Sequence, residues 1–230
     1  MIELYQFGQG WGINPSPFCL KAETYLRLAG LPYQTHRTLP NKAPRGKLPY
    51  IVDQGRVIPD SGEIIAYLQA TYSDRLDADL SDRDKALAHL LRRTIEDSLS
   101  YVLVHSRWID PMGLQEMRRA FLDRLPFPLR LIVPPLMQRR LKRMLHGQGT
   151  GRLPPDKIYA QGAADLQAVQ AILGDKPFLL GDRPTSIDAV CYGFLVNILR
   201  VPIESPLKQA AQALPGLTAY LERVDAVLAA

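Results

Sequence analysis

Segments with the composition of β-strands are confined to residues 1–60 of this chain, and each later periodic segment has helical spacing. Residues 2–7 and 33–38 are rich in strand-forming residues. Between them, apolar side chains recur at helical spacing over residues 17–29, which predicts a helix that Gly30 would end. A strand, a helix and a second strand in this order predict a parallel βαβ unit.

A second group of strands follows the βαβ unit. Residues 48–53 and 56–58 are short strand-like segments on either side of Gln54-Gly55, a dipeptide that favours a hairpin turn. Residues 61–72 then have helical spacing. A parallel strand pair followed by a hairpin, with helices interleaved, predicts a thioredoxin-like α/β domain over about residues 1–75.

The rest of the chain is expected to be an all-helical domain over residues 81–230, joined by a polar linker at 73–80. Helical periodicity recurs in four stretches, residues 81–108, 155–174, 185–200 and 214–229. Four prolines fall within residues 125–135 and are expected to kink or break a helix there. Thr185 and Asp188 have the spacing of a capping box before a buried apolar helix, and we interpret them as structural.

The composition fits a globular protein with a large core, because 47% of the residues are hydrophobic and 22% are charged. No run reaches the roughly 18 apolar residues that span a bilayer, and the first residues lack a signal-peptide pattern, so we expect a cytoplasmic protein. Cys19 and Cys191 are too few for a disulfide framework. The four histidines lack zinc-ligand spacing, so no metal is expected.

The formal net charge is +5, and the excess is not spread evenly. Five cations fall in one short window: Arg130, Arg139, Arg140, Lys142 and Arg143. Such a window is either the solvated face of a helix or a surface that attracts phosphate groups or anionic lipid. No nucleic-acid-binding motif accompanies it, so nucleic acid is not an expected partner.

Two short motifs near the N-terminus suggest a ligand site. Ser16 precedes Pro17 at a strand-to-helix turn, where the free N–H groups and the helix dipole stabilise an anion. A serine there can donate a hydrogen bond to a substrate thiolate, or it can simply cap the helix. Pro49 opens a strand and can adopt the cis form, which would leave the Leu48 backbone free to pair with an extended peptide. The alternative is an ordinary edge-strand proline.

A third motif, Asp60-Ser61, lies at the start of the helix over residues 61–72. The N–H groups of that helix and the serine hydroxyl suit a carboxylate, and the aspartate would pair with an α-ammonium group. Helix capping alone is the alternative. Each of the three motifs has a simpler explanation when taken alone, but their order and placement together favour a single site.

With these motifs, residues 1–75 resemble the thioredoxin-like domain of glutathione transferases. The resemblance covers nearly the whole chain and looks closest to the failed-axon and metaxin branch. It rests on residues 16–21, 23–26, 46–51, 60–61, 107–108, 151–152, 178–182 and 184–189. The implied fold is a thioredoxin-like α/β N-terminal domain followed by an all-α C-terminal domain.

The resemblance also implies a set of glutathione-binding residues: Ser16, Phe18, Lys47, Leu48, Pro49, Asp60 and Ser61. Ser16 would face the sulfur, Leu48 would pair with the cysteinyl backbone, and Lys47 would reach the glycyl carboxylate. Asp60 and Ser61 would bind the γ-glutamyl end, although Asp60 is one methylene shorter than the glutamate that is more usual there.

A glutathione transferase would use glutathione as co-substrate and join it to a small hydrophobic electrophile, and the resemblance implies a homodimer. Tyr101, His105 and Trp108 lie at helical spacing on one face of the segment over residues 81–108. We predict that they border the pocket for the second substrate. Plain core packing is the alternative.

Two other functions stay open. One is a non-catalytic, metaxin-like binding or membrane-associated assembly protein, which would dock through the basic window and the apolar residues 129–133. The other is glutathione thiol exchange at Cys19. Because Ser16 replaces the first cysteine of a C-x-x-C turn, a two-thiol cycle cannot run there. Cys19 would either form a mixed disulfide with glutathione or face inward and stay inert.

Overall fold

The computed structural model describes residues 1–229, and within them one four-stranded sheet has the order β2-β1-β3-β4. Its strands are β1 (Ile2–Gln6), β2 (Tyr33–Arg37), β3 (Tyr50–Asp53) and β4 (Arg56–Pro59). β1 pairs with β2 in parallel, whereas the pairs of β1 with β3 and of β3 with β4 are antiparallel. A parallel pair followed by a hairpin is the predicted thioredoxin-like arrangement.

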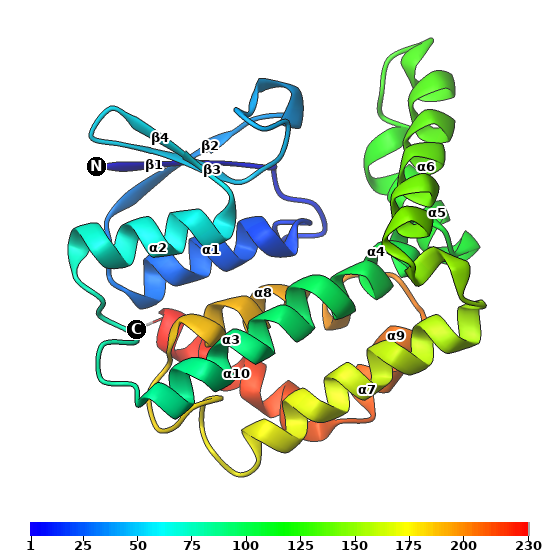
Figure 1. The fold of residues 1–230 in the computed structure, drawn as a ribbon. Helices are drawn as coiled ribbons and strands as arrows, with labels where there is room; N and C mark the ends of the chain where they lie inside the picture. The colour runs from blue at the N-terminus through cyan, green and yellow to red at the C-terminus, as the bar shows by residue number, and fades with distance from the viewer. Residues whose placement is uncertain (230) are drawn as a thin grey trace.

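Two helices cover one face of this sheet (Figure 1), α1 (Pro17–Leu28) and α2 (Ser61–Tyr72). Alternate residues of β1, Ile2 and Leu4, are buried in the core that the sheet shares with these helices. In the turn between β3 and β4, Gln54 and Gly55 have φ values of 49° and 77°, which the glycine adopts readily and the glutamine rarely does. The predicted helix and hairpin positions are therefore confirmed.

From Asp82 to Ala229 the regular elements are helices. They are α3 (Asp82–Thr94), α4 (Ser100–Trp108), α5 (Pro111–Met117), α6 (Leu129–Gln148), α7 (Pro155–Leu173), α8 (Ser186–Leu199), α9 (Pro206–Gln212) and α10 (Pro215–Ala229). Short π-helical turns occur at η2 (Ile95–Leu99) and η3 (Arg118–Leu122), and short 3-10 turns at η1 (Pro40–Lys42) and η4 (Thr150–Arg152). No helix among residues 1–229 is both long and apolar enough to cross a bilayer.

The expected break in the proline-rich stretch is present at Pro126 and Pro128, which lie between η3 and α6. A break is wrong for Pro134 and Pro135, which both lie inside α6. Each proline removes one hydrogen bond, so the carbonyls of Arg130 and Leu131 lose their donors within the helix. Both residues are exposed, and water can therefore satisfy these carbonyls. Periodicity also missed α5 and α9, because seven residues are too few to show a helical period.

The predicted capping box is present at the start of α8. Asp188 Oδ2 accepts hydrogen bonds from the Thr185 amide at 2.7 Å and from the Thr185 hydroxyl at 2.8 Å. Asp188 Oδ1 accepts from the Leu179 amide at 3.0 Å and from the Tyr220 hydroxyl at 2.9 Å. Burial raises the pKa of Asp188, and these donors oppose the rise. The carboxylate ties α8 to the preceding loop and to α10, which is a structural role.

Candidate functional site

Ser16 is the N-cap of α1, where the loop after β1 turns into the helix. Its backbone is extended, and its Oγ accepts a hydrogen bond from the Cys19 amide at 3.3 Å. Because the hydroxyl accepts this bond, its own hydrogen is available to donate. The residue is half-buried, and it lies where the helix dipole favours an anion. The predicted cap geometry is confirmed.

The loop that carries Ser16 is held from behind by the helical domain. Arg107 of α4 donates to the Pro15 carbonyl at 2.6 Å and to Asn197 Oδ1 at 2.8 Å. Asn197 of α8 donates to the Asn14 carbonyl at 3.2 Å, and Asn14 Oδ1 accepts from the Ser16 amide at 3.0 Å. Two helices of the second domain therefore set the position of the turn.

Arg107 is a buried charge, with 5% of its surface exposed. Burial lowers its pKa to about 10, which leaves the guanidinium charged at neutral pH. Its hydrogen bonds go to carbonyl and amide oxygens rather than to a carboxylate. The Trp11 ring lies below it, with the guanidinium carbon 5.9 Å from the ring centroid. The Arg107 guanidinium thus lies directly behind the Ser16 turn, and its hydrogen bonds among the described residues go to uncharged oxygen atoms.

Helix α8 approaches the backbone of α1 closely at Gly193. A Cβ there would lie 2.6 Å from the Pro17 carbonyl oxygen and 2.9 Å from the Lys21 amide nitrogen, which is too close for any other residue. Next to this contact, Phe18 packs edge-to-face on the buried Phe194, with ring centroids 5.3 Å apart. The Phe18 ring therefore packs between the two domains. The predicted contact of Phe18 with glutathione would be made by the Phe18 backbone.

The second predicted motif adjoins the first turn of α1. The Leu48-Pro49 peptide bond is cis, as the sequence suggested. The ladder pairs of β3 begin at Tyr50, so the Leu48 backbone takes no part in them. Leu48 is buried in a small cluster with Cys19, whereas Lys47 is exposed. The structure thus brings the Leu48-Pro49 segment against the helix that Ser16 caps.

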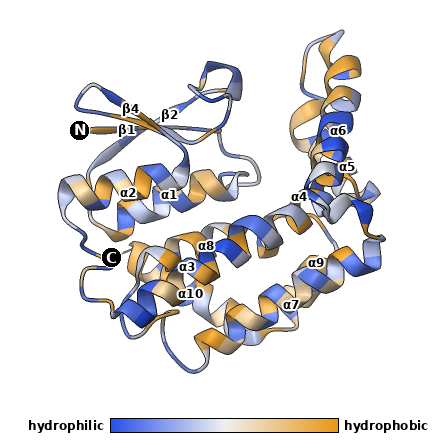
Figure 2. Cartoon of the chain, in the orientation of Figure 1, coloured by the Kyte–Doolittle hydropathy of each residue, from blue (hydrophilic) through white to orange (hydrophobic). Residues whose placement is uncertain are grey.

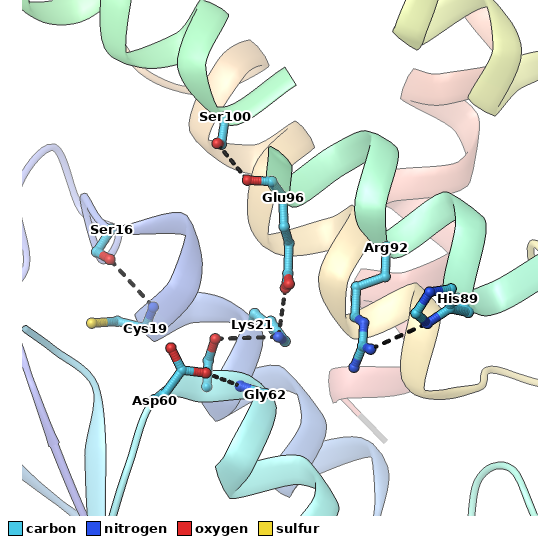
Figure 3. A network of polar contacts seen from close by, with 10 residues as sticks. Ser16, Cys19, Lys21, Asp60, Gly62, His89, Arg92, Glu96 and Ser100 are labelled. Atoms are coloured by element: carbon cyan, nitrogen blue, oxygen red, sulfur yellow. Dashed lines mark hydrogen bonds and ion pairs between the residues drawn. The ribbon is translucent and has the colours of Figure 1, made fainter. Parts of the chain in front are cut away.

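The third motif is linked to the helical domain through a buried lysine (Figure 3). Asp60 caps α2 with a φ of 69°, which is unusual for a residue other than glycine, and its Oδ1 accepts from the Gly62 amide at 2.8 Å. The Ser61 hydroxyl is buried and accepts from Lys21 Nζ at 3.2 Å. Lys21 also pairs with Glu96 Oε1 at 2.5 Å. Lys21 of α1 therefore joins Ser61 of α2 to Glu96 in η2.

Cys19 faces the interior of the protein and is fully buried. Burial raises the pKa of its thiol to about 11. At neutral pH the group is therefore a thiol, which is the unreactive form. Of the two alternatives for Cys19, this geometry supports the inert, inward-facing one over the mixed disulfide.

The three residues predicted to border a second-substrate pocket do not share one environment. His105 is buried, which lowers its pKa, and it borders a cavity of about 740 Å³ between α4, α6 and α7. Trp108 packs instead on a cluster that also contacts Trp11 and Phe121. Trp11 and Phe121 border a separate cavity of about 600 Å³ beside the loop after β1. Tyr101 is half-buried on the same helix.

Sequence reasoning did not assign roles to Lys21, Asn197 or Arg107, although two of them left a signal. Lys21 lies three residues after Phe18 and four before Tyr25, which places a charge on the apolar face of its helix. Asn197 interrupts the apolar run of α8. A polar group at such a position indicates a buried hydrogen bond. All three residues have partners that are distant in sequence, so the sequence did not indicate what each one contacts.

A thioredoxin-like domain followed by an all-helical domain, with a serine turn, a cis-proline before β3 and an aspartate–serine pair at α2, defines the glutathione transferase class of folds. Two family models match the chain, a glutathione S-transferase N-terminal domain over residues 17–113 and a glutathione S-transferase C-terminal domain over residues 162–224. Isoprene-epoxide–glutathione S-transferase from Rhodococcus sp. strain AD45 is 36% identical over 239 residues, covering 97% of this chain and 98% of that protein. The chain belongs to the glutathione S-transferase superfamily.

Other relatives agree with the predicted branch. Metaxin-1 from Macaca fascicularis is 30% identical over 234 residues, which cover 97% of this chain and 74% of that protein. Failed axon connections from Drosophila melanogaster is 28% identical, and the match spans 57% of its length.

Solved structures agree on the fold. A glutathione transferase from Phanerochaete chrysosporium has a TM-score of 0.68 at 18% identity, covering 98% of this chain and 96% of that one. A glutathione S-transferase from Ceriporiopsis subvermispora in complex with glutathione has a TM-score of 0.63 at 20% identity, with coverage of 98% and 96%.

Proposed function

We propose that the protein is a glutathione transferase in which the Ser16 hydroxyl donates a hydrogen bond to the sulfur of glutathione. The observation that carries this proposal is the Ser16 turn, because its hydroxyl hydrogen is available at the N-terminus of α1. The buried Arg107 guanidinium lies behind the same turn. A donor, a helix dipole and a nearby cation each favour the thiolate over the thiol. The thiolate is the nucleophilic form of glutathione.

The rest of glutathione would lie along the two neighbouring motifs. We assign the cysteinyl backbone to Leu48, which is outside the strand ladder, and the glycyl carboxylate to the exposed Lys47. The γ-glutamyl end would meet Asp60 and Ser61. Because the Ser61 hydroxyl accepts from Lys21, its hydrogen is left to donate to the ligand carboxylate. The exposed Asp60 carboxylate would pair with the α-ammonium group.

For the second substrate we propose a small apolar epoxide, following the name of the Rhodococcus relative. The thiolate sulfur would attack one ring carbon, so that a carbon–sulfur bond forms as a carbon–oxygen bond breaks. The resulting alkoxide takes a proton from water. The cavity bordered by Trp11 and Phe121 is the proposed site for this substrate, because Trp11 belongs to the loop that leads to Ser16. Trp108 packs on the same cluster as Trp11 and Phe121, and we propose that it supports the wall of this pocket from behind.

Calorimetric titration of glutathione and an epoxide-conjugation assay test the proposal together. We expect Ser16→Ala to retain glutathione binding but to lower kcat/KM roughly 100-fold, the usual effect of removing a donor to a developing anion. The matched variant Cys19→Ala should keep most of the activity, because that thiol is buried. Absence of binding at millimolar glutathione would overturn the proposal. Activity that depends on Cys19 and not on Ser16 would instead support thiol exchange.

Glutathione binding without turnover of any epoxide would favour the non-catalytic, metaxin-like alternative. We also propose a homodimer, which light scattering of the purified chain tests directly.

A further inference from the structure

The segment from Arg124 to Pro155, here called the basic arm, carries the whole positive excess of the chain. It holds seven of the 28 Lys and Arg residues and none of the 23 Asp and Glu residues. The basic arm therefore has a formal charge of +7, and the remainder of the chain has a charge of −2. An ordinary solvated helix face mixes both signs of charge, whereas this one does not.

The basic arm is also where exposed apolar side chains gather. Seven of the thirteen large hydrophobic residues that are exposed lie within it: Phe127, Leu129, Leu131, Ile132, Leu136, Met144 and Leu153. Phe127 is 72% exposed and Leu131 is 61% exposed. Figure 1 shows that α6 and the turn before it project from the helical domain, and Figure 2 shows hydrophobic residues concentrated at their far end. An apolar patch of this kind marks an interaction surface.

The charges and the apolar tip have a definite order along the arm. Residues 127–136 form the apolar tip, and the cations at 139–143 follow over the next turns of α6. At a membrane surface, apolar side chains enter the boundary between headgroups and acyl chains while cations contact the lipid phosphates. We propose that the basic arm docks the protein on the surface of an anionic lipid bilayer, with the tip inserted.

Two other occupants fit the same observations less well. A second copy of the chain that packs arm against arm would bring another charge of +7 into the contact, and like charges repel across an interface, while the rest of a second copy offers a charge of only −2 to balance the arm. Nucleic acid would satisfy the cations, but it would leave the apolar tip in water. Only a lipid surface covers both features.

Co-sedimentation of the full chain with vesicles tests the proposal. The probes are vesicles of phosphatidylcholine alone and of phosphatidylcholine with phosphatidylserine. We expect binding to the second kind only, with a loss at high salt because the cations are screened. Two variants separate the features: Leu131→Ser at the tip, and the charge-removing pair Arg139→Gln with Arg140→Gln. Leu131→Ser should weaken partitioning by about tenfold or more, and the arginine pair, at about 1 kcal/mol per charge, by roughly 30-fold. Leu90→Ser on α3, at a residue that is 63% exposed, is the matched control and should bind like the wild type.

Circular dichroism and glutathione conjugation show whether each variant folds, since all four positions are exposed. Failure of the folded wild type to sediment with phosphatidylserine vesicles would overturn the proposal, whatever the outcome for glutathione. Equal binding by the wild type and both variants would do so too. A change of oligomeric state in Leu131→Ser without vesicles would point to a second copy, and binding to duplex DNA that depends only on the arginines would point to nucleic acid. Either result would also overturn the lipid assignment.

Discussion

Replacing Glu96 with glutamine tests how far the buried Lys21–Glu96 pair stabilises the fold around the proposed glutathione site. Lys21 Nζ lies 2.5 Å from Glu96 Oε1, and the exposed fractions of the two side chains are 0% and 13%. Removing one partner of a buried pair leaves a charge without compensation and costs about 3–5 kcal/mol. Because Glu96 is partly exposed and the Ser61 contact remains, we expect a loss near the lower end, about 3 kcal/mol at neutral pH.

The pH dependence of this loss follows from the pKa of Lys21. Burial lowers that pKa and the Glu96 carboxylate opposes the shift, so glutamine lowers it further. A group with a lower pKa in the folded state makes the free energy of unfolding rise with pH between its folded and unfolded values. The unfolded value is about 10.4, and the folded value of the variant lies further below it than that of the wild type. The deficit of Glu96→Gln should therefore shrink as the pH rises from neutral toward the unfolded value.

Urea and thermal unfolding over this pH range measure the effect. For a chain of this size, about 3 kcal/mol corresponds to a fall in Tm of roughly 6–12 °C. Asp79→Asn is the control, because Asp79 pairs with Arg183 at the surface, where the side chains are 77% and 57% exposed. Its removal should cost about 1 kcal/mol or less. A Glu96→Gln variant as stable as the wild type, or one whose deficit is the same at every pH, would refute the reasoning.

Three further substitutions test other contacts. Asp188→Ala should lower the free energy of unfolding by about 3 kcal/mol in urea, because it strips acceptors from two buried amides and two hydroxyls. Gly193→Ala should cost about 1–3 kcal/mol by forcing α8 away from α1, whereas Gly147→Ala, in open space on α6, should stabilise slightly. Arg107→Met should raise the pKa of the thiol of bound glutathione, which thiolate absorbance measures. Arg107→Lys should raise it less, because lysine keeps the positive charge. An unchanged thiol pKa in a folded Arg107→Met variant would contradict the role of Arg107 in stabilising the thiolate.

The features that could be predicted from the sequence depend on residues close together in the chain. Ser16 caps α1 because the first amides of that helix are only a few residues away. Gly55 favours the positive φ that the hairpin turn requires, and Thr185 bonds with Asp188, which lies about one helical turn later. In each case the partner is fixed by local geometry, so the pattern of residue types is sufficient.

The remaining contacts of the site join residues that the fold alone brings together. The Arg107 bond to the Pro15 carbonyl spans 92 positions, and the Lys21–Glu96 pair spans 75. The polar character of these residues was visible in the sequence, but their partners depend on how α4 and η2 pack on the first domain. His105 and Trp108, which were predicted to share a pocket, lie in different surroundings for the same reason. Their helical spacing places them on one face, but the packing of other elements determines which neighbours cover each side chain.

These long-range contacts change how the proposed site should be understood. The Ser16 turn is held by Arg107 and Asn197, which belong to the helical domain. The Ser61 hydroxyl is held by Lys21, whose charge is balanced by Glu96 of the same domain. Two of the three motifs on the thioredoxin-like domain are thus linked to the helical domain, the Ser16 turn directly and Ser61 through Lys21. The proposed glutathione site is therefore a product of the contact between the two domains, and substitutions in the core of the helical domain can alter thiol activation without touching the ligand.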